Sequence, residues 1–210
     1  MNTNLRAHHV RPYTKSRFWN KPIIQYIGNP RKGECKIKQE KAIKARNTLF
    51  HNIPPVFDEH CHTLILGSFP SVASRDVCFF YGHPRNRFWQ VISAVFDAPI
   101  PDSMEAKKAL LLGHGLALWD VVARCEITGS GDASIRGALP NDLNPLLCAA
   151  PIGRVFTNGA AAHKLYRRFC LEQTGLPDIP LPSTSPANAS FSLPRLMEAW
   201  RQIKPAGSHN

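Results

Sequence analysis

The sequence has no apolar run long enough to cross a membrane, because its aliphatic stretches are interrupted by polar or charged residues within a few positions. It also lacks the apolar core of a secretory signal near its start. Polar residues separate Ile23 and Ile24 from Ile27, and the turn sequence Gly28-Asn29-Pro30 follows. We therefore expect a protein without a membrane span that works in the cytoplasm.

Cysteine pairs at a metal-binding or redox spacing are also absent. The six cysteines are widely and irregularly spaced, without a C-x-x-C motif, at positions 35, 61, 78, 125, 148 and 170. We expect reduced thiols, with Cys148 and Cys170 as small core residues among apolar neighbours. The cluster His60-Cys61-His62 has no second group of ligands at a suitable spacing, so we expect no metal site.

Two common catalytic motifs are missing as well. A nucleophile elbow needs G-x-S-x-G, and Gly67-Ser68-Phe69-Pro70 has neither that spacing nor an evident histidine partner. A phosphate-binding P-loop needs a Gly-Lys-Ser/Thr ending, which the chain does not contain. These absences argue against a serine hydrolase and against a nucleoside triphosphatase.

Acidic residues are scarce, and the resulting positive charge is unevenly distributed. The formal net charge is +11, and residues 1–50 hold twelve Lys and Arg against Glu34 and Glu40, which leaves the other 160 residues at +1. We expect a basic, flexible N-terminal extension over residues 1–51 and a folded domain over residues 52–205. The extension is either an arm that follows phosphates, with Trp19 and Tyr26 for stacking, or an inert segment.

From about Asn52 onward, short apolar runs alternate with helical stretches, which is typical of an α/β sheet layered by helices. We expect four strands, with the proline of the last favouring a sheet edge, at Thr63–Leu66, Leu116–Trp119, Val155–Thr157 and Ile179–Leu181. Helices are expected where the apolar period is helical or a cap precedes it, over residues 88–96, 104–112, 160–169 and between 187 and 203.

Ligands bind beyond the carboxyl ends of the strands in open α/β sheets, so the residues that follow each strand are the candidate site. These are Gly67-Ser68-Phe69-Pro70-Ser71, then Asp120, then Asn158-Gly159, then the loop Ser183–Asn188. They are rich in Gly, Pro, Ser and amides and poor in acid–base pairs. Such a cleft is unusual for a hydrolase of esters or peptides.

Two of these segments carry a family resemblance. Gly67–Ser71, continued by Phe80-Tyr81-Gly82-His83-Pro84-Arg85-Asn86-Arg87-Phe88-Trp89, resembles the first motif of the hypoxanthine-DNA glycosylases, a branch of the uracil-DNA glycosylase superfamily. Ser183-Thr184-Ser185-Pro186-Ala187-Asn188 resembles the second motif of that branch, a loop that enters the minor groove. The resemblance covers residues 62 to 203 and leaves the basic extension outside.

The resemblance implies a three-layer α/β/α sandwich around a mainly parallel four-stranded sheet, and an enzyme that hydrolyses the N-glycosidic bond of a deaminated base, hypoxanthine. Elsewhere in the superfamily a carboxylate or amide stands two residues after the first glycine and positions the water, whereas this chain has Phe69 there. The resemblance points instead to Asn86, whose carbonyl oxygen can orient water. The alternative role of Asn86 is to cap the following helix.

The pocket for a flipped base is expected from Gly67, Ser68, Phe69 and the residues that follow. Phe80 or Tyr81 is expected to stack on the base, and Asp120 to accept its N1–H. Asp120 has the alternative of a surface ion pair with Arg124 or Arg136. For Asn158, capping of the helix over residues 160–169 is preferred to base contact.

DNA contacts are expected from Arg85 and Arg87 and from the loop residues Ser183, Thr184, Ser185, Pro186, Ala187 and Asn188. No metal or organic cofactor is implied. No lysine is evidently placed for Schiff-base chemistry, so we expect a monofunctional, monomeric enzyme that acts on double- or single-stranded DNA with a damaged base, on the nucleoid. The alternatives are a uracil or mismatch-thymine glycosylase and a non-catalytic DNA-binding module on the same fold.

Overall fold

The computed structural model describes residues 47–127 and 135–205, and all of them lie in one compact unit. The basic segment expected to form an extension therefore falls outside the described residues, except for its last few positions. Among the described residues, no helix is long and apolar enough to cross a membrane.

The centre of the fold is a four-stranded parallel sheet with the order β3-β2-β6-β7. Its strands are β2 (Thr63–Gly67), β3 (Leu116–Asp120), β6 (Arg154–Asn158) and β7 (Asp178–Leu181). All five residues of β2 are buried, because helices cover both faces of the sheet and a central parallel strand has no solvent-facing side. The four expected strands are confirmed, and the proline-containing β7 lies at an edge as predicted.

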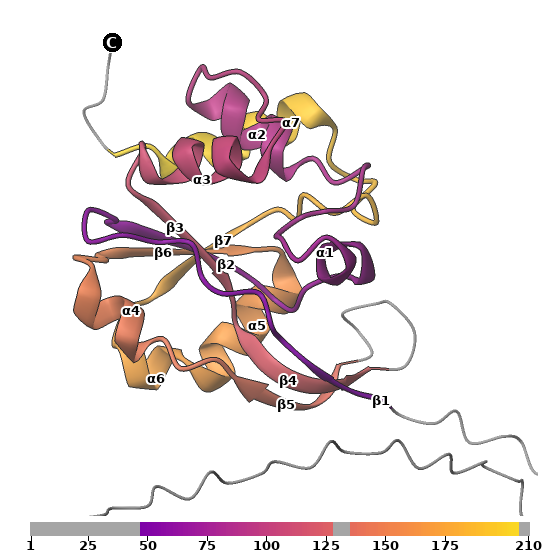
Figure 1. Cartoon of the computed structure of the whole chain (residues 1–210), viewed down its shortest axis with the longest axis vertical. Coiled ribbons are helices and arrows are strands. Elements are labelled where there is room, and N and C mark those ends of the chain that lie inside the picture. Colours follow the sequence, from indigo (N-terminus) through magenta and orange to yellow (C-terminus); the bar gives the residue numbers. More distant parts are fainter. Residues whose placement is uncertain (1–46, 128–134, 206–210) are drawn as a thin grey trace, which may run out of the picture. The chain divides into compact units, whose positions relative to one another are not determined.

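Helices cover the two faces of this sheet (Figure 1). One layer contains α2 (Phe88–Val95), α3 (Met104–Leu112) and α7 (Leu193–Trp200), the last followed by a short 3-10 turn over Arg201–Ile203. The opposite layer contains α4 (Asn144–Ala149), α5 (Ala160–Phe169) and α6 (Leu171–Thr174). The short α1 (Val72–Asp76) follows β2. This is the expected three-layer α/β/α sandwich.

A second sheet of three antiparallel strands, in the order β1-β4-β5, was not expected from the sequence. It consists of β1 (Asn47–Phe50), β4 (Val122–Ile127) and β5 (Arg136–Pro140). β4 begins two residues after the end of β3, and the backbone N–H groups of Val121 and Val122 donate to the carbonyls of Gly67 and Ser68. These bonds connect the start of the second sheet to the carboxyl end of β2.

The N-terminal boundary of the folded part lies earlier than Asn52. β1 pairs with β4 from Asn47 to Phe50, and the backbone N–H of His51 donates to the carbonyl of Ala123. The following segment runs beside β3, where Val56 forms a bridge with Leu118. The last residues of the expected extension are thus part of the fold. The rest of that extension, residues 1–46, lies outside the described residues.

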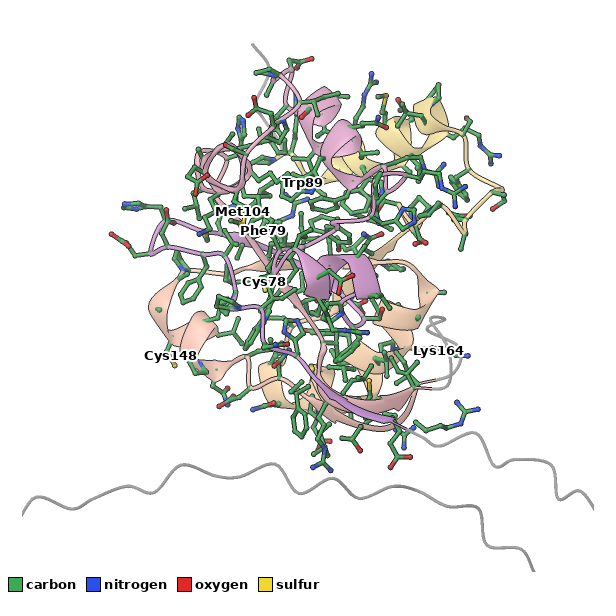
Figure 2. The ribbon with its side chains drawn as sticks, turned by 45° about the vertical axis from the view of Figure 1, so that its right-hand side comes forward. Cys78, Phe79, Trp89, Met104, Cys148 and Lys164 are labelled. Atoms are coloured by element: carbon green, nitrogen blue, oxygen red, sulfur yellow. The ribbon has the colours of Figure 1, made fainter. Side chains whose placement is uncertain are left out.

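The packing beside the sheet includes an aromatic stack and one of the two cysteines that were expected in the core. Phe79 and Trp89 stack with ring centroids 6.0 Å apart and form part of the cluster between the sheet and the α2–α3–α7 layer (Figure 2). Cys170 is buried as expected, and burial raises the pKa of its thiol to about 11. The expectation for Cys148 was wrong, because it is exposed on α4, where Leu146 is the buried residue.

Candidate active site

A pocket of about 400 Å³ lies beyond the carboxyl ends of the parallel strands. This volume is within the usual range for small-molecule sites. Most of the expected site residues line it, namely Gly67, Ser68, Phe69, Phe80, Tyr81, Asn86, Asp120, Asn158, Ser183, Thr184, Ser185, Ala187 and Asn188. The structure thus brings the four strand-end segments together, as the parallel topology predicts.

Asp120 and Gly67 end two neighbouring strands and are paired in register. A Cβ atom on Gly67 would lie 2.0 Å from Oδ1 of Asp120, so the carboxylate lies directly over the glycine backbone. Asp120 is only 4% exposed. Glycine is required at position 67 because any side chain would displace this carboxylate.

The partner of Asp120 is His51, which comes directly after β1. Nε2 of His51 lies 2.9 Å from Oδ2 of Asp120, and both side chains are almost completely buried. The alternative of a surface ion pair with Arg124 or Arg136 was wrong, because the carboxylate is buried and pairs with His51. No hydrogen bond between described residues uses Oδ1 of Asp120, the oxygen that lies over Gly67.

The aromatic residues of the pocket divide into buried and accessible ones. Phe69 is 7% exposed and Phe80 is 2% exposed, and both pack against the His51 ring with centroids 6.0 and 6.2 Å away. Tyr81 is half-buried and stacks on Phe88 of α2 at 3.9 Å. Its φ of 52° is in the left-handed region, which is uncommon for a non-glycine residue and is often found at functional sites.

Asn86, Thr184 and Asn158 form a continuous hydrogen-bond network across the pocket. The Asn86 Oδ1 accepts two hydrogen bonds of 3.0 Å, one from the backbone N–H of Phe88 and one from the Thr184 hydroxyl. Nδ2 of Asn158 donates to the Thr184 hydroxyl, and Oδ1 of Asn158 accepts from the Thr184 backbone N–H. Both lone pairs of the Asn86 carbonyl are therefore occupied, and its amide nitrogen is the group left to act in the pocket.

This network changes three expectations from the sequence. Asn158 does not cap α5, because Gly159 is the N-cap residue and no side chain caps there. The N-cap residue of α2 is Arg87 and not Asn86, although the Asn86 Oδ1 accepts from the first N–H of the helix and Asn86 also lines the pocket. Thr184 is fully buried, and its hydroxyl is committed to the two asparagines, so it connects the walls of the pocket instead of contacting DNA.

The second loop, Ser183–Asn188, is fastened by Arg87. The guanidinium of Arg87 donates to the carbonyls of Ser185 and Asn188, each at 2.9 Å, and to the carbonyl of Phe191. The expected phosphate contact of Arg87 is thereby corrected, because both terminal nitrogens of its guanidinium donate to carbonyls inside the protein. Arg85 is exposed and remains available for such a contact.

The loop also has internal bonds. Asn188 donates from Nδ2 to the carbonyl of Ser183 at 2.8 Å, and Ser185 donates from its backbone N–H to the Ser183 hydroxyl at 3.2 Å. Pro186 and Ala187 are exposed at the tip. The loop therefore presents a small, rigid tip beside the pocket.

The sequence did not point to Arg75, Ile127 or His51. Arg75, at the end of α1, lines the pocket with its guanidinium over the Phe69 ring at 5.7 Å, and it donates to the carbonyl of Pro70 at 2.9 Å. Ile127 lines it from the end of β4, and His51 lies behind Asp120. Of these three residues, Arg75 alone lies between the two parts of the first motif. That place in the sequence could have identified it as a pocket residue.

Metal ligands are not gathered in this region. Across residues 47–127 and 135–205, no three His, Cys, Asp or Glu side chains are arranged to hold a metal ion. The thiol of Cys61, beside the two histidines considered above, is buried and hydrogen-bonds with Asp58. Burial raises the pKa of Cys61 to about 11, which keeps it a neutral thiol at ordinary pH.

The sandwich with its strand-end pocket defines a class, the uracil-DNA glycosylase-like fold. The solution NMR structure of a candidate uracil DNA glycosylase from Methanosarcina acetivorans matches with a TM-score of 0.62 and 30% identity, over 73% of this chain and 97% of that chain. No protein-family model matches the chain.

Similar sequences identify the branch. A hypoxanthine DNA glycosylase of Methanosarcina acetivorans is 35% identical over 152 residues, which are 71% of this chain and 94% of that protein. A hypoxanthine DNA glycosylase of Methanosarcina barkeri is 31% identical over 99 residues, 47% of this chain and 63% of that protein. The chain belongs to the hypoxanthine DNA glycosylase family, whose members are hydrolases that act on N-glycosyl bonds in DNA.

Proposed function

We propose that this chain removes hypoxanthine from DNA by hydrolysing its bond to deoxyribose, and that it leaves an abasic site. Asp120 is the observation that supports the choice of base. Deamination of adenine replaces a ring nitrogen that accepts hydrogen bonds with an N1–H that donates one. A buried carboxylate at the pocket accepts from that N–H and repels the lone pair of adenine, so it separates the two bases strongly.

Tyr81 is the proposed stacking platform for the flipped base. Its position is fixed by the Phe88 ring behind it, and it is more accessible than Phe80, which belongs to the core cluster. An aromatic face fixed in this way binds a planar base without losing side-chain freedom at the moment of binding. Phe80 then supports the histidine behind Asp120.

Asn86 is the proposed catalytic residue, acting through its amide N–H. The departing purine takes up negative charge while the sugar becomes an oxocarbenium-like cation. Because Oδ1 already accepts two hydrogen bonds, Nδ2 is the atom that can stabilise this charge in the pocket. Arg75, the one lysine or arginine among the described residues that line the pocket, adds a positive charge over the Phe69 ring.

Substitution of Asn86 distinguishes this donor role from a water-holding role. Asn86→Ala should lower the single-turnover rate of hypoxanthine excision by about 100-fold, the usual cost of one such donor. Asn86→Asp should lose a similar amount, because its second oxygen would face the developing anion. If Asn86 instead held the water through its oxygen, the aspartate would keep or exceed wild-type activity. Asn144→Asp, on the exposed start of α4, is the matched control and should leave the rate unchanged.

The DNA-binding surface is proposed to surround the pocket mouth. Arg85 and the hydroxyls of Ser183 and Ser185 would contact phosphates, and the tip at Pro186 and Ala187 would enter the gap left by the flipped nucleotide. Such an enzyme would act as a monomer on the nucleoid, on duplex or single-stranded DNA. None of the described residues that line the pocket is a lysine, in accord with hydrolysis without a Schiff base.

A panel of substrates tests the proposal. Duplexes with a single hypoxanthine, uracil, xanthine or mismatched thymine are incubated with the protein, and abasic sites are then cleaved with alkali. Uracil is the second candidate base, because its N3–H is also a donor that Asp120 can accept. Fastest cleavage at hypoxanthine supports the proposal, faster cleavage at uracil or thymine favours the alternative glycosylase, and binding without cleavage at any base contradicts both.

A further inference from the structure

His51 is buried behind the pocket, and the proposal above gives it no role. Its side chain lies within an aromatic cage of Phe69, Phe80 and Trp119, whose ring centroids are 6.0 to 6.2 Å from that of the imidazole. Its side chain is 1% exposed. It directly follows β1, a strand of the second sheet, and lies outside the region of family resemblance.

The two ring nitrogens of His51 have different partners, which fixes where its proton is. The backbone N–H of Ile53 donates to Nδ1 at 3.3 Å, so Nδ1 has no proton. The proton is therefore on Nε2, which donates to Oδ2 of Asp120 at 2.9 Å. A neutral imidazole in this tautomer is a donor toward Asp120 and cannot accept from it.

We infer that His51 is a positioning residue that holds Asp120 in the orientation in which its oxygen Oδ1 faces the base. This inference rests on the proposed function, since it concerns the recognition of N1–H. The His51 donor occupies Oδ2 and holds the carboxylate in one orientation, with Oδ1 over Gly67 beside the pocket. A fixed acceptor at the pocket then distinguishes deaminated bases from their amino parents.

Phe69 has a place in the same arrangement. It stands where other members of the superfamily carry a water-positioning carboxylate or amide, and here it closes one side of the cage around His51 with its ring at 86° to the imidazole. An apolar ring at this position offers no competing acceptor to the Nε2–H. The histidine therefore donates to Asp120 alone among the described residues.

The sharpest test uses an asparagine at position 120. With His51 present, its Nε2–H must donate to the amide oxygen of Asp120→Asn. The amide NH₂ group then faces the pocket, where one donor meets another, the N1–H of hypoxanthine. With His51→Phe in the same chain, that constraint is gone and the amide can rotate to present its oxygen. His51→Phe should thus raise excision by the Asp120→Asn enzyme, while it lowers excision by the wild-type enzyme by about tenfold.

Single-turnover excision of hypoxanthine by the full-length protein is measured for the wild type, the two single variants and the double variant. His51→Gln, which keeps a donor near the place of Nε2, should retain most of the wild-type rate. His163→Phe is the matched control, because His163 forms a similar 2.7 Å pair with buried Asp178 away from the pocket. It should lower thermal stability without changing the rate.

Opposite signs of the His51→Phe effect in the two backgrounds support the inference. A loss of the same size in both backgrounds overturns it, because a purely structural histidine would act alike whatever stands at position 120. If His51→Phe does not fold, the single variant Asp120→Asn still tests the inference. Excision by Asp120→Asn at the wild-type rate would overturn it. If the wild-type protein releases no hypoxanthine, the proposed function fails and the inference falls with it.

Discussion

At the scale of single residues, the site depends on the contact between Gly67 and Asp120. Gly67→Ala places a methyl group 2.0 Å from Oδ1 of Asp120. The carboxylate cannot move away without losing its hydrogen bond with His51. We expect a loss of stability of about 1–3 kcal/mol and a much larger loss of hypoxanthine excision. Chemical unfolding and single-turnover kinetics measure the two effects.

The control for that substitution is Gly153→Ala, where an added Cβ meets no atom within 4 Å. It should leave both stability and excision unchanged. Normal excision by Gly67→Ala would mean that the position of Asp120 is not critical to the reaction, contrary to the role given to it.

At the scale of structural elements, Arg87 connects the start of α2 to the second loop. Arg87→Met removes the donors to two loop carbonyls and to that of Phe191, and should cost about 1–3 kcal/mol of stability, with weaker DNA binding as the loop loosens. Arg85→Met, two residues away and exposed, should bind DNA less well at unchanged stability. Equal melting temperatures for the two variants would show that Arg87 does not fasten the loop.

The elements also show what the sequence can predict. The four parallel strands were recognisable because strands buried on both faces appear as short apolar runs. The antiparallel sheet was not, because β4 contains Arg124 and Glu126, β5 contains Gly137 and Pro140, and β1 follows directly on the basic segment. Such a composition is typical of polar loops, and only the pairing of these segments with one another identifies them as strands.

The same limits apply to the site. Parallel topology brings strand ends together, so Gly67, Asp120 and Asn158 were predictable from their places in the chain. His51 was not, because it reaches Asp120 only through a pairing across 69 residues. The charge of Arg87 suggested phosphate, whereas its partners in the fold are backbone carbonyls.

At the scale of the whole molecule, the positive charge is concentrated near the N-terminus of the sequence. All twelve Lys and Arg of the first fifty residues lie within residues 1–46, and the first strand among the described residues begins at Asn47. A chain that starts at Asn47 keeps β1 and His51. If the basic segment follows phosphates, this chain should bind DNA more weakly at low salt and with a shallower salt dependence, while its excision rate at saturation is unchanged.

Fluorescence anisotropy over a range of salt concentrations measures the comparison with the full-length protein. Equal affinity and an equal salt slope would show that the segment is inert. A chain that starts at Asn52 is the informative control, because it also loses β1 and His51 and should lose excision as well.

The most direct measurement of the central claim is the identity of the products. The full-length protein is incubated with a duplex that contains one deoxyinosine, and the products are identified by mass spectrometry. We expect free hypoxanthine and a strand with an intact abasic sugar that breaks only in alkali. Binding without release of the base, or a covalent protein–DNA adduct trapped by borohydride, would contradict it.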